Sequence, residues 1–355
     1  MTALTAVDLF AGAGGATQGL RDAGFQVLGA VELDSDAARS YKLNHPDTRL
    51  YQCDIRTLPA QKMRRDLGLA SGELTLLKAC PPCQGFSTLS GGRSTDEARD
   101  DLIRQVVRFV RAFKPRAILL ENVPGLARDP RFGELTSRLS GLGYSFSTYR
   151  LNAIDFGVPQ RRSRLVVLAV KGLRSRLPEN FWDNFASDER PSAVTAGNAL
   201  ERLDQESRVG DPLSKYRKLA AKTLARVSAI PVGGTRFDLP EHLRLRCHND
   251  VDRKGKGARR ATGSYGRIRL DSPAPTMTTR CTTPACGSFI HPIENRGITL
   301  REAAWFQTFP YTYDFEGTYE SIERQIGNAV PVRMAKYLGL AVVATIVTVA
   351  RSGGD

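Results

Sequence analysis

A glycine-rich turn decides the fold, because the stretch Asp8-Leu9-Phe10-Ala11-Gly12-Ala13-Gly14-Gly15 joins an apolar run to a helical pattern. The apolar run Ala6–Phe10 is typical of a buried strand, and the helical pattern covers Ala16–Ala23. A strand, a glycine turn and a helix in this order begin an open α/β sheet, in which ligands bind at the carboxyl ends of the strands. The stretch therefore predicts a ligand site around Gly12 and Gly14.

Three other positions restrict the kind of ligand. Glu32 ends the next apolar run, about 20 residues beyond the turn, where an acid can bind ribose hydroxyls. The dinucleotide pattern G-x-G-x-x-G needs a third glycine where Thr17 stands, which argues against NAD and leaves a nucleoside cofactor without phosphates open. Asp54 could accept a hydrogen bond from an adenine amino group, although a helix cap is its simpler interpretation.

Strand-like and helix-like runs alternate through the first half of the chain. The other strand-like runs are Val27–Leu33, Leu74–Ala79, Ala117–Val123 and Leu165–Val170. The other helix-like runs are Ser35–Asn44, Arg99–Phe113 and Phe132–Leu142. This alternation predicts a doubly wound, mostly parallel α/β sheet with helices on both faces.

The alternation stops near Lys171, and the chain is irregular from there to about residue 295, with many Arg, Gly, Pro and Ser. Residues 241–270 contain nine Lys or Arg and three Asp or Glu, so this part is either a solvated surface or a small nucleic-acid-binding insert. Helical pattern returns at Thr299–Phe306 and again from Asn328 to the end. We therefore expect a catalytic domain over 1–170, a target-recognition insert over 171–296, and a segment over 297–355 that returns to the catalytic domain.

Composition and charge limit the class of protein. Of 355 residues, 41% are hydrophobic, so a globular protein of about two domains is expected. The 51 Lys and Arg exceed the 37 Asp and Glu by 14, which favours a polyanionic partner. The N-terminus shows no signal-peptide pattern, and Leu338–Ala350 is shorter than the roughly 20 residues of a membrane span, so we expect a buried helix there. Six cysteines without a secretory signal predict reduced thiols and a cytoplasmic protein.

A second turn, Cys80-Pro81-Pro82-Cys83-Gln84-Gly85-Phe86-Ser87, follows the strand-like run Leu74–Ala79. A zinc site would need two more ligands at suitable spacing, and neither Cys247-His248 nor Cys281 with Cys286 supplies it, so we expect no metal. A redox pair would belong near the first helix of a thioredoxin-like unit. The remaining interpretation is one nucleophilic cysteine on a rigid turn, whose thiol needs activation by its site.

Taken together, these segments resemble the DNA cytosine-5 methyltransferase family, and they occur in the family's order. The resemblance covers about residues 5–170 and 290–350. It is carried by the glycine turn, Glu32, Asp54, Pro81–Ser87, Glu121-Asn122-Val123, Gln160–Arg164, Leu300–Ala304, Gln307–Pro310 and Gln325–Pro331.

The resemblance implies S-adenosylmethionine as the cofactor and assigns residues to it. By this likeness Phe10 stacks on the adenine, Glu32 holds the ribose, and Asp54 with Ile55 reads the adenine edge. Asn328 and Val330 close the site from the C-terminal part of the chain. The remaining residues that the resemblance places at the cofactor are Gly12, Gly14, Pro82 and Leu102.

The resemblance also implies a covalent mechanism. The thiol of Cys83 adds to carbon-6 of cytosine, which makes carbon-5 nucleophilic enough to accept the methyl group. Glu121 supplies the acid at ring nitrogen 3, because electrons flow into the ring during this addition. Arg162 and Arg164 hold the cytosine carbonyl and a backbone phosphate, for which a planar guanidinium is suited.

A base inside a duplex hides carbon-6, so the resemblance implies that the enzyme flips the cytosine out of double-stranded DNA. Ser87–Asp100 is expected to close over the DNA, and its contacts would include Ser87 and Arg93. In the insert, Arg259, Arg260, Arg267 and Arg269 are expected to contact phosphates or bases.

The biological setting is also an expectation. The chain shows no long regulatory extension, which suits a bacterial or phage enzyme that is monomeric and either solitary or paired with a restriction endonuclease. Two alternatives remain open at this stage: a transfer RNA cytosine-5 methyltransferase, and a non-catalytic nucleic-acid-binding protein on the same fold. The length of the insert favours DNA over transfer RNA, and the presence of Cys83, Glu121 and Arg164 favours an enzyme.

Overall fold

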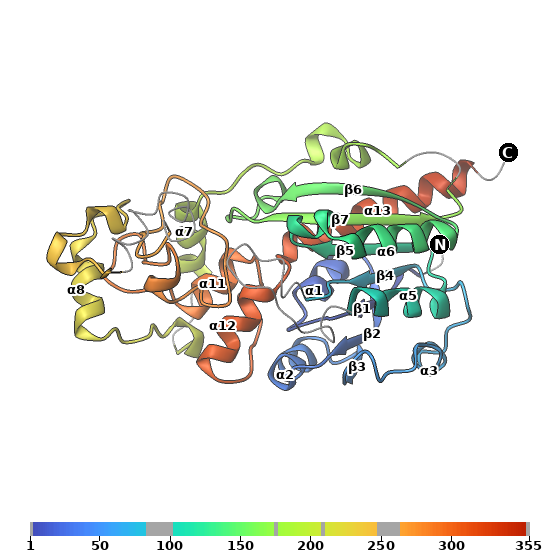
Figure 1. Ribbon diagram of the computed structural model, residues 1–355, viewed down its shortest axis with the longest axis horizontal. Coiled ribbons are helices and arrows are strands. Elements are labelled where there is room, and N and C mark those ends of the chain that lie inside the picture. The colour runs from blue at the N-terminus through green and yellow to red at the C-terminus, as the bar shows by residue number, and fades with distance from the viewer. Residues whose placement is uncertain (1–2, 83–101, 174–176, 207–209, 247–262, 353–355) are drawn as a thin grey trace.

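The computed structural model describes residues 3–82, 102–173, 177–206, 210–246 and 263–352, with side chains through Val347. A seven-stranded sheet with helices on both faces forms one end of the molecule, and the insert forms the other end (Figure 1). Cys83, Ser87, Arg93, Arg259 and Arg260 lie outside the described residues.

The sheet has the strand order β3-β2-β1-β4-β5-β7-β6. Its first five strands are parallel, and β7 runs antiparallel to both β5 and β6. The strands are β1 (Thr5–Leu9), β2 (Gln26–Glu32), β3 (Arg49–Gln52), β4 (Leu76–Ala79), β5 (Ala117–Asn122), β6 (Tyr144–Asn152) and β7 (Ser163–Lys171). The predicted doubly wound, mostly parallel sheet is therefore confirmed, and β3 and β6 complete it.

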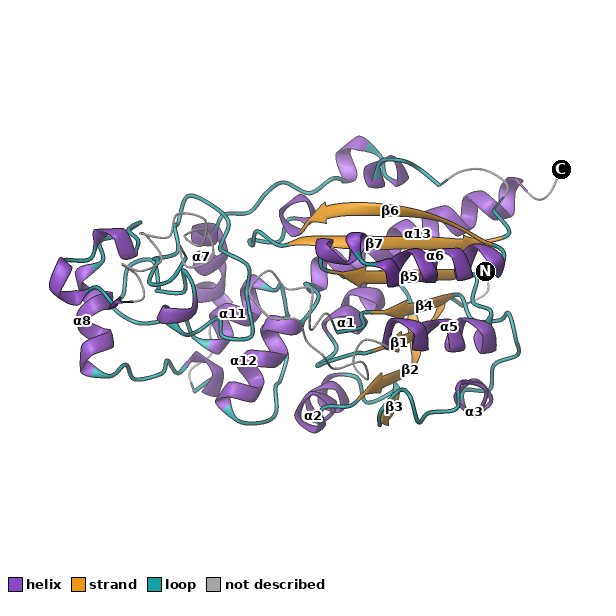
Figure 2. Ribbon diagram, in the orientation of Figure 1, coloured by secondary structure: helices purple, strands orange, loops and turns teal. Residues whose placement is uncertain are grey.

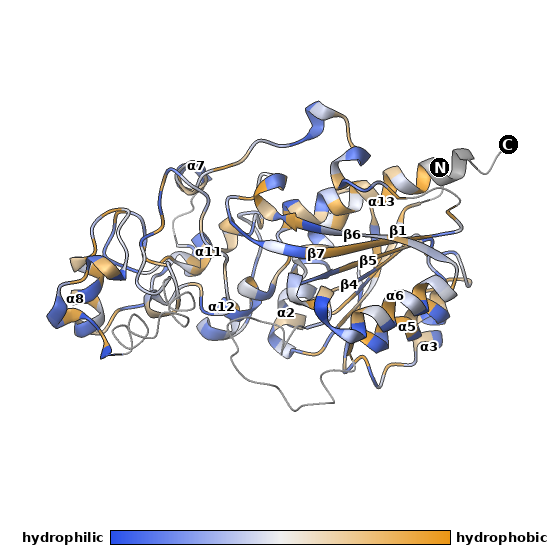
Figure 3. Cartoon of the chain, turned by 45° about the horizontal axis from the view of Figure 1, so that its top comes forward, coloured by the Kyte–Doolittle hydropathy of each residue, from blue (hydrophilic) through white to orange (hydrophobic). Residues whose placement is uncertain are grey.

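Side chains along each strand point alternately to the two faces of the sheet, and an apolar layer covers each face. On one face Leu9 and Leu120 pack with Val106 of α5. On the other face Leu76 and Val166 pack in a second cluster. Figure 3 shows the strands as the apolar centre of this part of the chain. The helices around the sheet are α1 (Gly15–Asp22), α2 (Ser35–Asn44), α3 (Ala60–Asp66), α5 (Leu102–Phe113), α6 (Pro130–Gly141) and α13 (Val332–Ser352).

Local signals explain where these helices begin. The Asp34 carboxylate accepts hydrogen bonds from the amides of Asp36 and Ala37 and so caps α2. Asp129 caps α6, and Pro130 at its first position needs no hydrogen-bond partner for its nitrogen. The run Tyr319–Val347 is long and apolar enough to span a membrane, but 61% of its apolar window is buried within the protein. Met334, Leu338 and Val342 of α13 lie against the sheet, as expected of a core helix.

The described residues of the insert contain little regular structure, as predicted (Figure 2). Its helices α7 (Ala196–Glu206) and α8 (Ala221–Ala229) are joined by long connections. Helices α11 (Leu300–Phe306) and α12 (Tyr319–Asn328) share an apolar cluster with α7, so this part of the C-terminal segment packs with the insert before α13 reaches the sheet. Short 3-10 helices cover Pro124–Arg128, Ala153–Phe156, Phe181–Asn184, Ser187–Glu189, Pro212–Ser214, Arg236–Asp238, Glu241–Leu243 and Pro284–Cys286.

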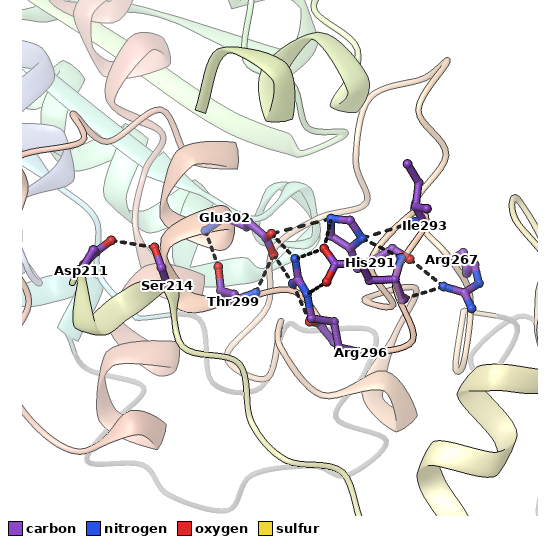
Figure 4. A network of polar contacts seen from close by, with 10 residues as sticks. Asp211, Ser214, Arg267, His291, Ile293, Arg296, Thr299 and Glu302 are labelled. Carbon is purple, nitrogen blue, oxygen red and sulfur yellow. Dashed lines mark hydrogen bonds and ion pairs between the residues drawn. The ribbon is translucent and has the colours of Figure 1, made fainter. Parts of the chain in front are cut away.

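A polar network ties the insert to the start of α11 (Figure 4). Thr299 and Glu302 form a capping box at the first turn of α11. The Glu302 carboxylate also accepts two hydrogen bonds from Arg296, at 2.8 and 2.9 Å. Arg296 in turn pairs with Glu294, and His291 lies 3.8 Å from Glu302. The network fixes the helix start against the irregular chain that precedes it.

Candidate cofactor and catalytic site

Glu32 holds the glycine turn in place. One carboxylate oxygen of Glu32 accepts the amide hydrogen of Gly12 at 2.8 Å, and the other accepts the amides of Leu33 and Asp34 at 2.9 and 2.8 Å. Burial raises the pKa of Glu32, while these amides oppose the shift. The sheet edge thus presents an oriented acid beside the turn, where the sequence predicts a nucleoside site.

The surface around Glu32 suits an adenosine group. Gly12 adopts a left-handed φ of 56°, and open space lies where a Cβ would stand. Phe10, which is half-buried, also has a positive φ of 59°, a backbone conformation that few large residues adopt. The side chain of Leu33 is 64% exposed immediately beyond Glu32. The Glu32 carboxylate can hold a ribose, and the side chains of Phe10 and Leu33 can cover a base.

A buried ion pair joins β1 and β4, the strands that precede the glycine turn and the thiol turn. Lys78 of β4 donates to Asp8 of β1 at 2.7 Å, and the two residues are register partners in the sheet. Burial alone would lower the pKa of Lys78, but Asp8 raises it above its ordinary value. The other Asp8 oxygen accepts the hydroxyl of Thr17 at 2.8 Å. Thr17 therefore replaces the third glycine of a dinucleotide turn with a hydrogen bond to the first strand.

Three further residues that we expect at the cofactor are Asp54, Ile55 and Leu102. Both carboxylate oxygens of Asp54 accept hydrogen bonds from the Arg56 side chain, which lowers the pKa of Asp54. Ile55 and Leu102 pack in the same apolar cluster. Asp54 can accept from an adenine amino group only by sharing oxygen atoms that Arg56 already occupies.

The chain segment after α12 reaches the start of α1. Val330 is buried, and its carbonyl oxygen lies so close that a Cβ on Gly15 would stand 2.9 Å from it. Asn328, the last residue of α12, is exposed. The structure thus places Val330 beside the glycine turn, with Asn328 two residues before it, although about 315 residues separate Val330 from Gly15 in sequence.

The thiol turn is fixed by the neighbouring strand. The Asn122 side chain, at the end of β5, donates to the carbonyl oxygen of Pro81 at 3.0 Å. Pro82, by contrast, is exposed. Cys80 packs with Ala16 and Val330, and burial raises the pKa of the Cys80 thiol. Cys80 is therefore a packing residue, which leaves Cys83 as the candidate nucleophile of this turn.

Glu121 and Arg164 form the second part of the site. Arg164 Nε lies 2.7 Å from Glu121 Oε1, and the two side chains are 13% and 10% exposed. Glu121 is adjacent to Asn122, so the acid stands next to the residue that holds Pro81. The guanidinium orients the carboxylate at the edge of the sheet, beside the thiol turn.

Arg162 differs from the sequence-based expectation. Its guanidinium donates to the carbonyl oxygens of Met277 and Gly327, and the residue is only 3% exposed. It connects the start of β7 with the insert and with the end of α12. A guanidinium committed to backbone carbonyls is not oriented for a cytosine or a phosphate, so the structure favours a scaffold role for Arg162.

The two described arginines of the expected DNA patch also differ from each other. Arg267 is 6% exposed and donates to the carbonyl oxygens of Ile230, Val227, His291 and Glu294, so it belongs to the interior of the insert. The expectation that Arg267 contacts DNA is corrected by this burial. Arg269 is exposed but forms a two-point ion pair with Asp271.

Sequence reasoning gave no role to several residues that support the site. Lys78 and Asn122 stand at strand ends, where their position alone could have marked them. Leu33 could have been found as the apolar residue that follows Glu32. Nothing in the local sequence indicates that Tyr313 contacts the glycine turn, where its hydroxyl donates to the carbonyl oxygen of Ala13 at 2.5 Å.

Comparisons with known proteins identify the family of the chain. Residues 4–344 match the family described as C-5 cytosine-specific DNA methylase. The chain is 32% identical over 345 residues to the Type II methylase M.HgiDII of Herpetosiphon aurantiacus, with 95% of this chain and 94% of that protein covered. It is 31% identical over 427 aligned positions to the Type II methyltransferase M.AgeI of Thalassovita gelatinovora, with 96% and 98% covered.

Solved structures share the fold. A prophage-encoded protein of E. coli, described as a DNA modification methyltransferase, superposes with a TM-score of 0.67 at 24% identity, covering 97% of this chain and 99% of that one. The Dnmt2 methyltransferase of S. pombe superposes with a TM-score of 0.66 at 18% identity, with the same coverage. The family match over nearly the whole chain and the agreement in fold together show that this chain belongs to the C-5 cytosine-specific DNA methylase family and is a DNA cytosine-5 methyltransferase.

Proposed function

We propose that the chain transfers the methyl group of S-adenosylmethionine to carbon-5 of a cytosine in a specific duplex DNA sequence, with Cys83 as the nucleophile. The observation that carries the proposal is the pairing of Glu121 with Arg164 beside the thiol turn that Asn122 holds through Pro81. A methyltransferase of this family needs a nucleophile and an acid at one end of the sheet, and β4 and β5 are neighbouring parallel strands that end there.

Cofactor binding is assigned to the glycine turn and Glu32. The buried carboxylate of Glu32 would accept the ribose hydroxyls, and Phe10 and Leu33 would cover the adenine. When bound, S-adenosylmethionine supplies a methyl group on a positively charged sulfur. Gly12 leaves the space above the turn open, which a larger residue at this position would fill.

The protein residues divide the remaining chemistry between them. The Cys83 thiolate would form a bond to carbon-6, and Glu121 would hydrogen-bond ring nitrogen 3 as electrons move into the ring. Arg164 would keep the Glu121 carboxylate in its orientation. After methyl transfer, loss of the carbon-5 proton and departure of the Cys83 sulfur from carbon-6 would restore the aromatic ring.

The setting of the reaction is also a proposal. The relatives M.HgiDII and M.AgeI are named Type II methylases, so we infer a bacterial protein that acts on cytoplasmic DNA and protects the site of a restriction endonuclease. The insert over 171–296 would read the sequence, and the protein would act as a monomer. DNA rather than transfer RNA is favoured by the family and by these relatives.

Trapping of the covalent complex tests the proposal. Duplex DNA that carries 5-fluorocytosine in the target sequence cannot lose a proton from carbon-5, so it should remain bonded to Cys83 in the presence of S-adenosylmethionine. The complex should survive denaturing electrophoresis, and mass spectrometry should place the bond on Cys83. Cys83→Ser should abolish trapping while Cys80→Ser retains it. A bond to Cys80, or equal methyl transfer to transfer RNA, would overturn the proposal.

A further inference from the structure

We propose that Tyr313 is a positioning residue of the cofactor turn and the last member of a buried path of contacts that links the insert to that turn. The inference rests on the proposed function, since it assumes that the glycine turn holds S-adenosylmethionine. The path runs from Asp211 of the insert through Arg301 to Tyr313, and from there to Ala13 and Gly14.

At the glycine turn the path ends in hydrogen bonds in which each donor has an acceptor. The Tyr313 hydroxyl donates to the Ala13 carbonyl oxygen at 2.5 Å. His45 Nε2 lies 2.9 Å from the Tyr313 oxygen and 3.2 Å from the Gly14 carbonyl oxygen. Arg21 can only donate, and its Nη1 lies 3.4 Å from His45 Nδ1. The consistent tautomer therefore carries its hydrogen on Nε2, which donates toward Gly14 and Tyr313.

The turn fits closely against these two side chains. Gly14 has a φ of 97°, and a Cβ at this position would stand 2.6 Å from both His45 Nε2 and the Tyr313 hydroxyl. His45 is fully buried and Tyr313 is 3% exposed. Any displacement of the Tyr313 hydroxyl must therefore change its contacts with the backbone that approaches the cofactor.

The other end of the path lies in the insert. Arg301 of α11 donates to the Tyr313 carbonyl oxygen at 3.1 Å. The same guanidinium forms a two-point ion pair with Asp211, at 2.7 and 3.2 Å, and both side chains are 6% exposed. Asp211 also caps the 3-10 helix Pro212–Ser214 of the insert. Three buried side chains thus connect the insert with the glycine turn.

Apolar packing follows the same route. Ala13 of the turn belongs to the apolar cluster of the insert and of α11, not to either layer of the sheet. The Tyr313 ring packs against Phe309 and Phe315, with ring centroids 4.7 and 5.4 Å away. One side of the cofactor turn is therefore part of the insert core. A change in the insert on binding DNA would alter cofactor affinity, and cofactor would alter DNA affinity by the same factor.

The first test removes one hydroxyl. Tyr313→Phe should raise the dissociation constant for S-adenosylmethionine about tenfold, the effect of losing one buried hydrogen bond. At saturating cofactor, kcat should stay within about threefold of the wild type, because Tyr313 contacts no reacting atom. Tyr144→Phe is the matched control, since Tyr144 is also buried and donates to the Pro115 carbonyl oxygen at 2.7 Å. It should alter stability alone.

The second test breaks the path in the insert. Asp211→Asn removes the charge that pairs with Arg301, and it should weaken cofactor binding measured by calorimetry with the target duplex present. Asp129→Asn is the control, because Asp129 also caps a helix and pairs with an arginine, Arg131, at 2.7 Å. It should leave cofactor binding unchanged.

The outcomes separate this inference from the proposed function. If Glu32→Ala weakens cofactor binding and Tyr313→Phe and Asp211→Asn do not, the glycine turn holds the cofactor and the path is refuted. If Glu32→Ala also has no effect, the placement of the cofactor itself is wrong. Equal effects of Tyr313→Phe and Tyr144→Phe on cofactor affinity would likewise overturn the positioning role.

Discussion

The catalytic domain and the insert bury polar groups for different purposes. In the catalytic domain the strands satisfy one another's backbone, and the buried ion pairs Asp8–Lys78 and Glu121–Arg164 gather where the strands end. Within its described residues the insert has few regular elements, and Arg267 donates to four of its carbonyl oxygens. These two ion pairs therefore lie at the proposed cofactor and catalytic sites, whereas the buried guanidinium of Arg267 stabilises the insert.

The sharpest test of this comparison replaces Glu121 by Gln, which keeps the shape but removes the acid. We expect kcat/KM for methyl transfer to fall by about 10²–10⁴, the contribution of a positioned acid or base. Because the Arg164 charge loses its ion pair, the melting temperature should fall as well, so activity is measured at a temperature where the variant is folded. Glu134→Gln is the control, because Glu134 pairs with Arg104 and Arg138 on the surface. Retention of activity in Glu121→Gln would place the acid elsewhere.

The corresponding test in the insert is Arg267→Met. The substitution leaves four carbonyl oxygens without this donor, and the contacts to Val227 and Ile230 are buried, so unfolding should become about 3 kcal/mol easier. Amide exchange over 227–230 and 290–295 should accelerate more than exchange in the sheet. A variant of unchanged stability with weaker DNA binding would instead restore Arg267 to the DNA surface.

The difference between the two regions also explains which features the sequence predicts and which it does not. The five expected strands of the sheet are all present, since continuous apolar runs between turns are a local signal. The strand β6 was not predicted because it contains no continuous apolar run, since Ser145, Ser147 and Arg150 interrupt it at the edge of the sheet. The scaffold role of Arg162 could not be predicted, because it depends on the carbonyls of Met277 and Gly327, which the fold brings from distant positions.

A pH-dependent prediction concerns His45, at the junction of the two regions. Burial lowers the pKa of His45 to about 4 from 6.5, and Arg21 adds to the effect. Between these values the unfolded chain binds the proton and the folded chain does not, so stability is full above pH 6.5 and falls as pH drops toward 4. The loss between pH 7.5 and 5 should be about 2 kcal/mol.

Urea unfolding of His45→Gln at the two pH values measures this contribution. The variant should lose less stability between pH 7.5 and 5 than the wild type does. His242→Gln is the control, because His242 is exposed in the insert. An identical pH dependence of the wild type and His45→Gln would show that His45 is not held neutral at the junction.

The smallest expected effect is at the surface of the insert and concerns Arg269. Its two-point pairing with Asp271 leaves no net charge at this position, and the two side chains are 61% and 67% exposed. Exposed pairs of this kind contribute less than about 1 kcal/mol to stability, so Arg269→Ala should leave the melting temperature nearly unchanged.

Arg259→Ala with Arg260→Ala should lower the slope of log K for DNA against log salt by about 2, if each contacts one phosphate. Arg269→Ala should change that slope by less than about 0.5, because Asp271 already neutralises the guanidinium. Equal slope changes for Arg269 and for either of the other two arginines would show that the ion pair opens on DNA, and the insert would then present a charged surface that the free protein hides.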